Sequence, residues 1–272
     1  AAETNASRRL LGGRRQKNLT ESVSFDRAAD YYDRTRTLSE HLIPNLLPLL
    51  PGDGVCLEIG VGTGRIALPL VEKGIRIVGV DIAPEMLKKL VAKRNGTWPC
   101  VAVADATGLP FADQTFASAI AAHVLHLTPD WRSAVVELLR VLRSHGVLVA
   151  TRGGASRPRR HREVRSRFFK EAGDPPWPPG LDTIDELDAH ALGLGLGVHA
   201  LPDLVTEDSI SVNQLLAMLE AGYWSACWSI DEETRRRAAT ATRQWAREKI
   251  GDLDLERHTV ETMRWHAYRL AE

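Results

Sequence analysis

Cysteine, net charge and long apolar runs are all scarce in this chain of 272 residues, and each shortage excludes a class of protein. The three cysteines, Cys56, Cys100 and Cys227, fit neither a disulfide framework nor a metal site, so we expect reduced thiols in a cytoplasmic protein. Because no apolar run reaches about 18 residues, we expect no membrane span. Lys plus Arg and Asp plus Glu are both 35, so the molecule as a whole is not adapted to nucleic acid or anionic membranes.

The N-terminal segment lacks an apolar stretch as well. Residues 1–20 are rich in arginine and hold no apolar core long enough for a secretion signal, and we expect this segment to be mobile. The rest of the chain is ordinary for a globular protein, with 44% hydrophobic and 26% charged residues. Nothing in this composition opposes a well-buried core.

Short apolar segments alternate with amphipathic ones between residues 51 and 152. Five segments are expected to be strands: VCLEIG, IRIVGVD, PCVAVADA, FASAIAAHV and VLVATR. Three segments between them are expected to be helices: RIALPLVEKG, APEMLKKLVAKRNG and PDWRSAVVELLRVLRSHG. Strands that alternate with helices of this length predict a parallel sheet with helices on both faces, an α/β fold.

The segments on either side of this region are predicted to complete the domain. Residues 21–50 should form N-terminal helices, and the basic and then proline-rich stretch 153–180 should be an insertion. Beyond it we expect a helix in TIDELDAHALGLG, a strand around VHALPDLV, helices over about 210–222 and 231–249, and an edge strand in RHTVETMRWHAYRLA. Residues 51–272 would then be one ligand-binding domain, with 153–180 and about 206–250 as inserted cap elements.

A glycine-rich turn joins the first predicted strand to the helix that follows it. The segment LEIGVGTGR places Gly60, Gly62 and Gly64 at alternate positions, so that a ligand can lie against bare backbone at the carboxyl edge of the sheet. Dinucleotides favour G-x-G-x-x-G, but Arg65 occupies the place of their third glycine. The carboxylate of Glu58 would repel a pyrophosphate and would suit a ligand with an ammonium and a sulfonium group.

These motifs, taken in order, resemble the class I S-adenosylmethionine-dependent methyltransferases, in particular the group called methyltransferase type 11 or UbiE-like. The resemblance covers roughly residues 25–152 and rests on five segments: FDRAADYYDRTR, LEIGVGTGR, VGVDIAPEML, VADATGLPFADQTF and AAHVLHLTPDW. It implies a Rossmann-like, doubly wound, mostly parallel seven-stranded sheet, lid helices at the N-terminus and a helical insertion after the fifth strand. The family's Phe-Asp pair entering the fourth strand is Phe116-Ala117 here, a position that supports the sheet more than the ligand.

The resemblance also implies which residues bind S-adenosylmethionine and its product S-adenosylhomocysteine. Glu58 would lie near the methionine amino group, Asp81 on the ribose hydroxyls and Asp105 near the adenine amino group, although both aspartates could instead be helix or turn caps. The full set implied is Tyr32, Arg36, Glu58, Gly60, Gly62, Thr63, Gly64, Asp81, Ile82, Met86, Asp105, Ala106 and Ala122. No metal ligand set is expected.

The methyl acceptor is less defined by the sequence. His123 and His126 follow the fourth strand, where the methyl group would be delivered, and either could be a base or could simply shape the site. The absence of an Asn-Pro-Pro-Tyr motif there argues against methylation of exocyclic base amines, and the absence of a Pro-Cys pair argues against a nucleophile for cytosine C5. We therefore expect a small-molecule acceptor methylated on O, N or C. Two alternatives stay open: a methyltransferase of RNA or other nucleic acid that uses the arginine-rich segment 152–170, and a protein of this fold that binds the cofactor without transferring its methyl group. The oligomeric state is left open.

Overall fold

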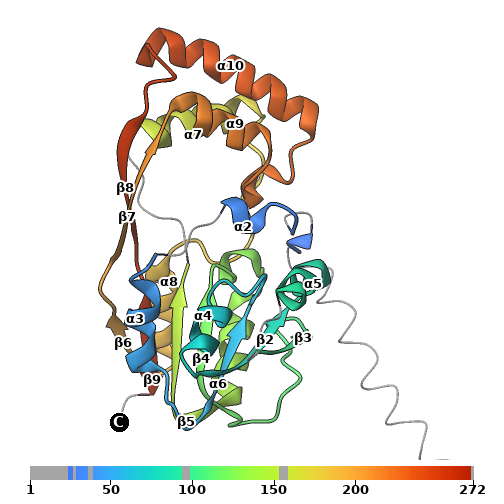
Figure 1. The fold of residues 1–272 in the computed structure, drawn as a ribbon, viewed down its shortest axis with the longest axis vertical. Coiled ribbons are helices and arrows are strands. Elements are labelled where there is room, and N and C mark those ends of the chain that lie inside the picture. Colours follow the sequence, from blue (N-terminus) through green and yellow to red (C-terminus); the bar gives the residue numbers. More distant parts are fainter. Residues whose placement is uncertain (1–23, 27–28, 36–38, 94–98, 153–158, 271–272) are drawn as a thin grey trace, which may run out of the picture. The chain divides into compact units, whose positions relative to one another are not determined.

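The structure is a computed structural model that describes residues 24–26, 29–35, 39–93, 99–152 and 159–270 (Figure 1). Residues 1–20, which we expected to be mobile, lie outside the described residues. The elements of the first half are α2 (Tyr32–Thr35), α3 (Leu42–Leu46), η2 (Leu47–Leu49), β1 (Val55–Ile59), α4 (Ala67–Glu72), β2 (Arg76–Asp81), α5 (Pro84–Ala92), β3 (Cys100–Val103), β4 (Phe116–Ala122), η3 (Leu125–Leu127), α6 (Trp131–Val141) and β5 (Leu142–Thr151). Those of the second half are α7 (Arg159–Glu171), α8 (Ile184–Gly193), β6 (Leu196–Ala200), β7 (Leu204–Ile210), α9 (Val212–Glu220), η4 (Ser225–Cys227), α10 (Glu232–Ile250), β8 (Arg257–Met263) and β9 (His266–Leu270).

A seven-stranded sheet, counted over the described residues, runs in the order β3-β2-β1-β4-β5-β9-β6. Strands β1 to β5 pair in parallel, while β9 pairs antiparallel with both β5 and β6. The strand order reverses direction between β1 and β4, so a crevice opens at the carboxyl ends of these two strands. The predicted doubly wound, mostly parallel α/β fold is confirmed.

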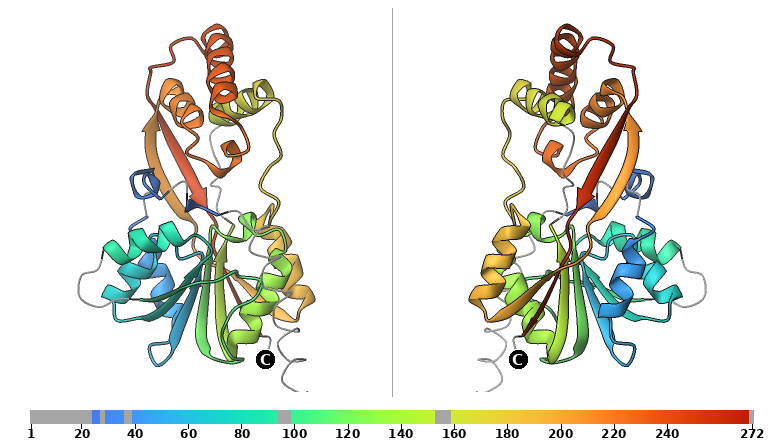
Figure 2. Two further views of the ribbon diagram at one scale, coloured as in Figure 1. Left: turned by 90° about the vertical axis from the view of Figure 1, so that its right-hand side faces the viewer. Right: turned by 90° about the vertical axis from the view of Figure 1, so that its left-hand side faces the viewer.

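Helices cover both faces of this sheet, as Figure 2 shows from two sides. The helices α3, α4 and α5 lie on one face, and α6 and α8 lie on the other. All seven residues of β4 are buried, because this central strand is covered on both faces. Its small residues, such as Ala119 and Ala121, allow the apolar side chains of α6 and α8, such as Leu138 and Leu187, to pack closely on the sheet. This core supports the backbone of the crevice from below.

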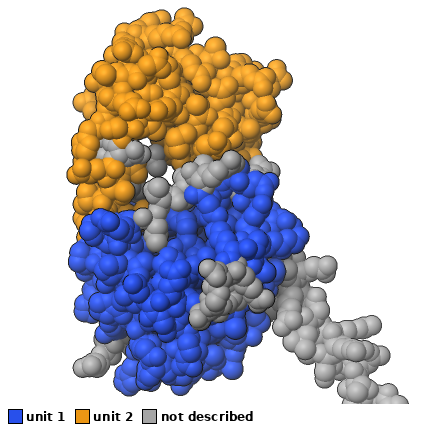
Figure 3. Space-filling view, viewed as in Figure 1, with its two compact units in different colours: residues 1–153, 179–202, 264–272 blue, residues 154–178, 203–263 orange. Residues whose placement is uncertain are grey.

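The chain divides into two compact units, which Figure 3 distinguishes by colour. Unit 1 consists of residues 1–153, 179–202 and 264–272, and it contains the sheet. Unit 2 consists of residues 154–178 and 203–263. Within unit 2, α7, α9 and α10 pack around an apolar core that includes Phe168, Leu216 and Ala239, and β7 pairs with β8 as a two-stranded ribbon.

Two of the expected helices, α10 and α8, begin directly after a side chain that caps them. Asp231 accepts a hydrogen bond from the N–H of Thr234 at 2.8 Å, and α10 begins directly after it, as expected. Thr183 caps α8 by accepting from the N–H of Glu186 at 3.2 Å. These helices were predictable because the capping side chains act within one turn.

Three expectations about the strands are wrong. The helix after β4 ends at Val141, because Leu142 pairs with Phe116 and begins β5. The single strand expected around residues 198–205 is two strands in different sheets, β6 and β7, separated at Pro202, which has no N–H to donate to a ladder. The last segment is also two strands, and β9 lies inside the sheet between β5 and β6 instead of at its edge.

Candidate functional site

The glycine-rich turn after β1 adopts a backbone that requires glycine. Gly60, Gly62 and Gly64 all have positive φ angles, of 66°, 55° and 81°. A Cβ atom on Gly60 would lie 2.7 Å from the side chain of Val124, and one on Gly64 would lie 2.7 Å from Leu90. The first glycine therefore lets the turn pass under the segment after β4, while the third permits close packing on α5.

Asp81, at the end of β2, is held by backbone N–H groups from two segments. Its two carboxylate oxygens accept from Gly62 and from Ala83, each at 2.8 Å. The residue is only 9% exposed, and burial raises the pKa of its carboxyl despite these two donors. The arrangement holds the carboxylate rigidly in the pocket beside the glycine turn, where ribose hydroxyls could donate to it.

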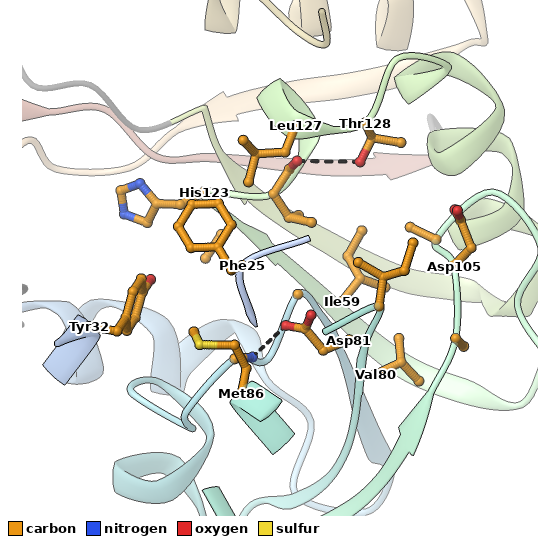
Figure 4. A pocket seen from close by; sticks show the side chains of 17 residues that line it. Phe25, Tyr32, Ile59, Val80, Asp81, Met86, Asp105, His123, Leu127 and Thr128 are labelled. Carbon is orange, nitrogen blue, oxygen red and sulfur yellow. Dashed lines mark hydrogen bonds between the residues drawn. The ribbon is translucent and has the colours of Figure 1, made fainter. Parts of the chain in front are cut away.

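Asp105 lies at the opposite end of the same pocket from Tyr32 and His123, with Asp81 between them (Figure 4). Its Oδ1 accepts from both the backbone N–H and the hydroxyl of Thr107, at 2.9 and 2.8 Å. Asp105 is thus a turn cap and a pocket residue at once. The two interpretations left open by the sequence do not exclude one another.

Glu58 is a buried carboxyl group beneath the glycine turn. It is 2% exposed and accepts a hydrogen bond from the N–H of Ala67, while its Oε2 has no hydrogen-bond partner among the described residues. Burial raises the pKa of Glu58 to about 8, against an attraction from Arg65. An unmatched buried acceptor of this kind favours a cationic ligand group nearby.

A short segment before α3 covers one side of the pocket. We call residues 24–26 and 29–35 the strap. Phe25 and Tyr32 of the strap line the pocket, and their rings meet edge to face with centroids 5.9 Å apart. Ala29 is buried between them against Ala83 and Met86. The strap therefore closes the pocket with apolar side chains.

Acidic residues fasten the strap to α5. Asp26 accepts from the N–H of Glu85 at 2.8 Å, in the first turn of the helix, and Asp30 pairs with Lys89 at 2.7 Å. These contacts are exposed to solvent, so each stabilises the closed strap only weakly.

Asp33 of the strap bonds to two different residues. One oxygen accepts from the hydroxyl of Thr63 in the glycine turn at 2.6 Å, and the other pairs with Lys93 at 2.7 Å. Lys93 also donates to the carbonyl of Thr63 at 2.8 Å. Although burial acts to raise it, these bonds from Lys93 and Thr63 hold the pKa of Asp33 below its ordinary value. The strap is thus bonded directly to the loop that forms the floor of the pocket.

The other end of the pocket is formed by residues that follow β4. His123 has a positive φ of 55° and its N–H donates to the carbonyl of Thr151 at 3.3 Å. This left-handed backbone is uncommon for a residue other than glycine and is often found at functional positions. Leu127 and Thr128 complete this wall, and the Thr128 hydroxyl donates to the carbonyl of Val124 at 3.3 Å.

The pocket brings together most, but not all, of the residues expected from the sequence. Its space is about 640 Å³, a figure that includes the part open to solvent. The expected residues that line it are Tyr32, Gly60, Gly62, Asp81, Ile82, Met86, Asp105, Ala106, Ala122 and His123. Those that do not line it are Glu58, Thr63, Gly64 and His126, and Arg36 lies outside the described residues.

Several lining residues were not expected. They are Phe25, Ile59, Val80, Ala104, Val124, Leu127 and Thr128. The alternating exposure of a strand end could have suggested Ile59 and Val80, because each directly precedes a predicted ligand residue. Leu127 and Thr128 lie in AAHVLHLTPDW, one of the segments that carry the resemblance, although neither was singled out as a ligand residue; they line the pocket at the end of η3.

The described residues hold neither a group of three His, Cys, Asp or Glu side chains suited to a metal ion nor a helix long and apolar enough to cross a membrane. Cys56 and Cys227 are buried free thiols, and Cys100 is exposed.

The chain is similar to a known protein family and to several curated proteins. Residues 57–150 match a family model described as a methyltransferase domain. An uncharacterised protein of Methanocaldococcus jannaschii is 30% identical over 155 residues, which cover 54% of this chain and 72% of that protein. The demethylmenaquinone methyltransferase of Renibacterium salmoninarum is 32% identical over 136 residues, which cover 47% of this chain and 56% of the relative.

Other similar proteins are matched over a smaller share of their length or at lower sequence identity. An uncharacterised protein of Mycobacterium tuberculosis is 33% identical over 119 residues, 41% of this chain and 43% of the relative, so the chain spans less than half the length of the first curated relatives it matches. A solved structure from Anaeromyxobacter dehalogenans, assigned as a type II methyltransferase, has a TM-score of 0.60 at 21% identity and covers 86% of this chain and 98% of that one. The YcgJ protein of Bacillus subtilis has a TM-score of 0.59 at 17% identity, covering 85% and 97%. These two structures show a shared fold.

Proposed function

We infer, from the premise that this chain belongs to the class I S-adenosylmethionine-dependent methyltransferase family, that it transfers a methyl group from S-adenosylmethionine to a small-molecule acceptor. The observation that carries this proposal is the pair of carboxylates in one pocket. Asp81 and Asp105 both line it, with the glycine turn beside Asp81, so a nucleoside could direct its ribose at one carboxylate and its base at the other. S-adenosylmethionine supplies the activated methyl group when bound.

The arrangement supports this cofactor over a dinucleotide. Gly64 packs closely on Leu90 of α5, and Arg65 stands where a third dinucleotide glycine would be. Glu58 is buried in the strand that leads into the same turn, and its ionised form would repel phosphate. Asp81 alone would suit either ligand, because both carry a ribose.

The acceptor end of the pocket favours an uncharged, largely apolar molecule. Phe25, Val124 and Leu127 are among the apolar residues that line the pocket, and His123 lies with Tyr32 at the end opposite Asp105 (Figure 4). The relative named demethylmenaquinone methyltransferase acts, by its name, on an apolar molecule. We propose an acceptor of this physical class, with the reacting O, N or C atom directed at the methyl group.

In this proposal the chain's own residues act by positioning. The strap and the wall after β4 exclude water and hold the acceptor in line with the methyl group. His123 is the candidate base, because it lines the pocket whereas His126 does not, and it would take the proton that the acceptor loses. His126 supports the wall through its carbonyl, which accepts from the N–H of Gly180 at 3.2 Å.

An RNA substrate is less well supported. Arg165 stacks on the ring of Trp224 at 5.0 Å and Arg167 on that of Trp245 at 5.9 Å, so part of the arginine-rich segment serves the packing of unit 2. We therefore keep a small molecule as the acceptor class. The free thiols at Cys56, Cys100 and Cys227 favour the cytoplasm as the place where the enzyme works.

Two measurements test the proposal. Calorimetry should show S-adenosylhomocysteine binding to the protein, with NAD binding much more weakly, and the reverse ranking would refute the cofactor assignment. The protein, a labelled methyl donor and a cell extract should then yield label in the metabolite fraction. Label confined to RNA would refute the acceptor class, and bound cofactor without any labelled product would indicate a protein that does not transfer the methyl group.

A further inference from the structure

The segment that joins β3 to β4 lines part of the pocket, although it is neither a helix nor a strand. It consists of residues 104–115, all of which the structure describes, and Ala104, Asp105 and Ala106 at its start line the pocket. Connecting segments are more mobile than the elements they join unless other parts of the protein bond to them. The contacts that hold this segment therefore determine where the carboxylate of Asp105 lies.

Glu137 and Arg140 of α6 bond to this segment as a pair. Nε and Nη2 of Arg140 donate to the two carboxylate oxygens of Glu137 at 2.8 and 2.9 Å. The same guanidinium donates to the carbonyl of Leu109 at 3.1 Å and to that of Phe111 at 2.8 Å. Its Nη1 also donates to the carboxylate of Asp113 at 2.7 Å. One planar fork of donors thus holds three residues of the segment.

Leu109 is held at both of its backbone polar groups. Its N–H donates to Oε2 of Glu137 at 2.9 Å, and its carbonyl accepts from Arg140. The side chains of Glu137 and Arg140 are only 21% and 31% exposed, so water and salt screen these contacts less than those of a surface ion pair. The hydrogen bonds from Arg140 hold the pKa of Glu137 below its ordinary value, which keeps this carboxylate ionised at neutral pH.

A short turn connects Leu109 to Asp105. The carbonyl of Asp105 accepts from the N–H of Gly108 at 3.1 Å and closes the turn. Before the turn, the N–H of Ala104 donates to the carbonyl of Asp81 at 3.1 Å. The turn is therefore fixed to β2 at one end and to α6 at the other, and a displacement of Leu109 would displace the carboxylate of Asp105.

We propose that Glu137 and Arg140 are positioning residues for base recognition: by fixing Leu109, they hold the carboxylate of Asp105 where it accepts a hydrogen bond from an exocyclic amino group. The inference rests on the proposed function, because the amino group is that of the cofactor's adenine. Neither Glu137 nor Arg140 lines the pocket, so both act through the segment and not by touching the ligand. The pair thereby sets a preference for adenine over a base with an oxo group at the same position.

The test compares two ligands that differ in the base. S-adenosylhomocysteine carries a 6-amino group, which donates hydrogen bonds, whereas S-inosylhomocysteine carries a 6-oxo group, which would face the carboxylate with an oxygen atom. Calorimetry should show that the parent protein prefers S-adenosylhomocysteine on the order of 10- to 100-fold, the value of a hydrogen bond to a charged group. Arg140→Met should reduce this preference to within about threefold, by weakening S-adenosylhomocysteine while the affinity for S-inosylhomocysteine changes little.

Two further variants separate positioning from a general loss of stability. Arg243→Met is the matched control, because Arg243 pairs with Glu220 in unit 2 at 2.8 Å and these side chains are similarly exposed, at 26% and 30%. Its removal should leave the preference between the two ligands unchanged. Arg140→Lys keeps the charge but loses the fork of donors, so it should recover part of the preference that Arg140→Met loses.

The outcomes are distinguishable. If Arg140→Met lowers both affinities equally, or neither of them, the proposal is overturned. A parent protein that binds the two ligands equally well would also overturn it, while leaving the proposed cofactor in place. A parent protein that binds neither ligand would refute the proposed function, and the inference with it.

A second variant covers the case in which Arg140→Met does not fold, as judged by circular dichroism. Glu137→Gln keeps the size of the side chain but removes the charge that binds Arg140 and the N–H of Leu109. It should reduce the preference for S-adenosylhomocysteine by at least about threefold. A preference equal to that of the parent protein would overturn the proposal.

Discussion

Glu58 should make the stability of the ligand-free protein fall as the pH rises. Burial holds its pKa at about 8 in the folded protein, against 4.5 for an ordinary glutamate. Between these two values the unfolded chain has released the proton and the folded chain has kept it. Because the unfolded state binds fewer protons there, the free energy of unfolding decreases with pH. Each pH unit contributes up to about 1.4 kcal/mol, so the whole interval contributes at most about 5 kcal/mol.

The variant Glu58→Gln isolates this contribution. Glutamine has nearly the same shape and never ionises, so its free energy of unfolding minus that of the parent should rise from pH 5 to pH 8.5 by a few kcal/mol. Urea unfolding followed by tryptophan fluorescence measures it at each pH. Asp81, whose pKa burial also raises, is present in both proteins, so its contribution cancels in the difference apart from its repulsion of the Glu58 carboxylate.

A control variant and a refuting result follow from the same structure. Glu72→Gln removes an exposed carboxylate at the end of α4, and its difference from the parent should stay constant across the range. If the Glu58→Gln difference is equally flat, the carboxyl is not desolvated as the structure implies, and the reasoning is refuted. If S-adenosylhomocysteine places its ammonium near Glu58, binding below pH 8 should also release a proton, detectable by calorimetry in two buffers of different ionisation enthalpy.

Four further changes test other parts of the site. Asp81→Ala should lower the affinity for S-adenosylhomocysteine roughly 10- to 100-fold and, because it frees two backbone N–H groups, the free energy of unfolding by about 1–3 kcal/mol; calorimetry and urea unfolding measure these, and parental values would contradict the assignment. Lys93→Met should speed the release of S-adenosylhomocysteine measured by stopped flow. Raising NaCl from about 0.05 to about 0.5 M should accelerate this release less in the variant than in the parent protein, and an equal acceleration in both would show that ion pairing does not hold the strap. Gly180→Ala should lower the free energy of unfolding by about 1–3 kcal/mol, since a Cβ there would lie 2.2 Å from the carbonyl oxygen of Leu125; no loss would mean that η3 shifts freely. His123→Ala should reduce turnover by ~10²–10⁴-fold with cofactor affinity kept within about threefold, and an unaltered pH profile of turnover would show that His123 is not a base.

The ligand residues of the glycine turn and of β2 could be predicted because each acts near its own place in the chain. A strand, the glycine turn after it and an acid at the end of the next strand can each be recognised from a few consecutive residues, so Gly60, Gly62 and Asp81 were predictable. Asp81 has a partner that was not predictable, because the N–H of Gly62 meets it only after β1 and β2 have paired.

Contacts between distant segments were the part that sequence patterns missed. The bond between Asp33 and Thr63 joins the strap to the glycine turn; each residue lies in a recognised motif, but neither motif indicates that the two residues meet. The alternation of polar and apolar residues in the last segment, which includes β9, predicts a strand at the edge of a sheet. Its period gives the two faces of a strand but not its neighbours, which here are β5 and β6.

The position of β9 has a consequence for how the protein is made. Among the described strands, β6 pairs only with β9, yet residues 201–265 separate the two in the chain and include most of unit 2. At ~5–20 residues per second, translation leaves β6 without a neighbour for roughly 3–13 seconds, and it leaves β5, which is made earlier, with an open edge for longer. Open strand edges are templates for pairing with other chains. The nascent protein therefore passes through an interval in which aggregation competes with folding, and this interval ends when β9 pairs with β5 and β6.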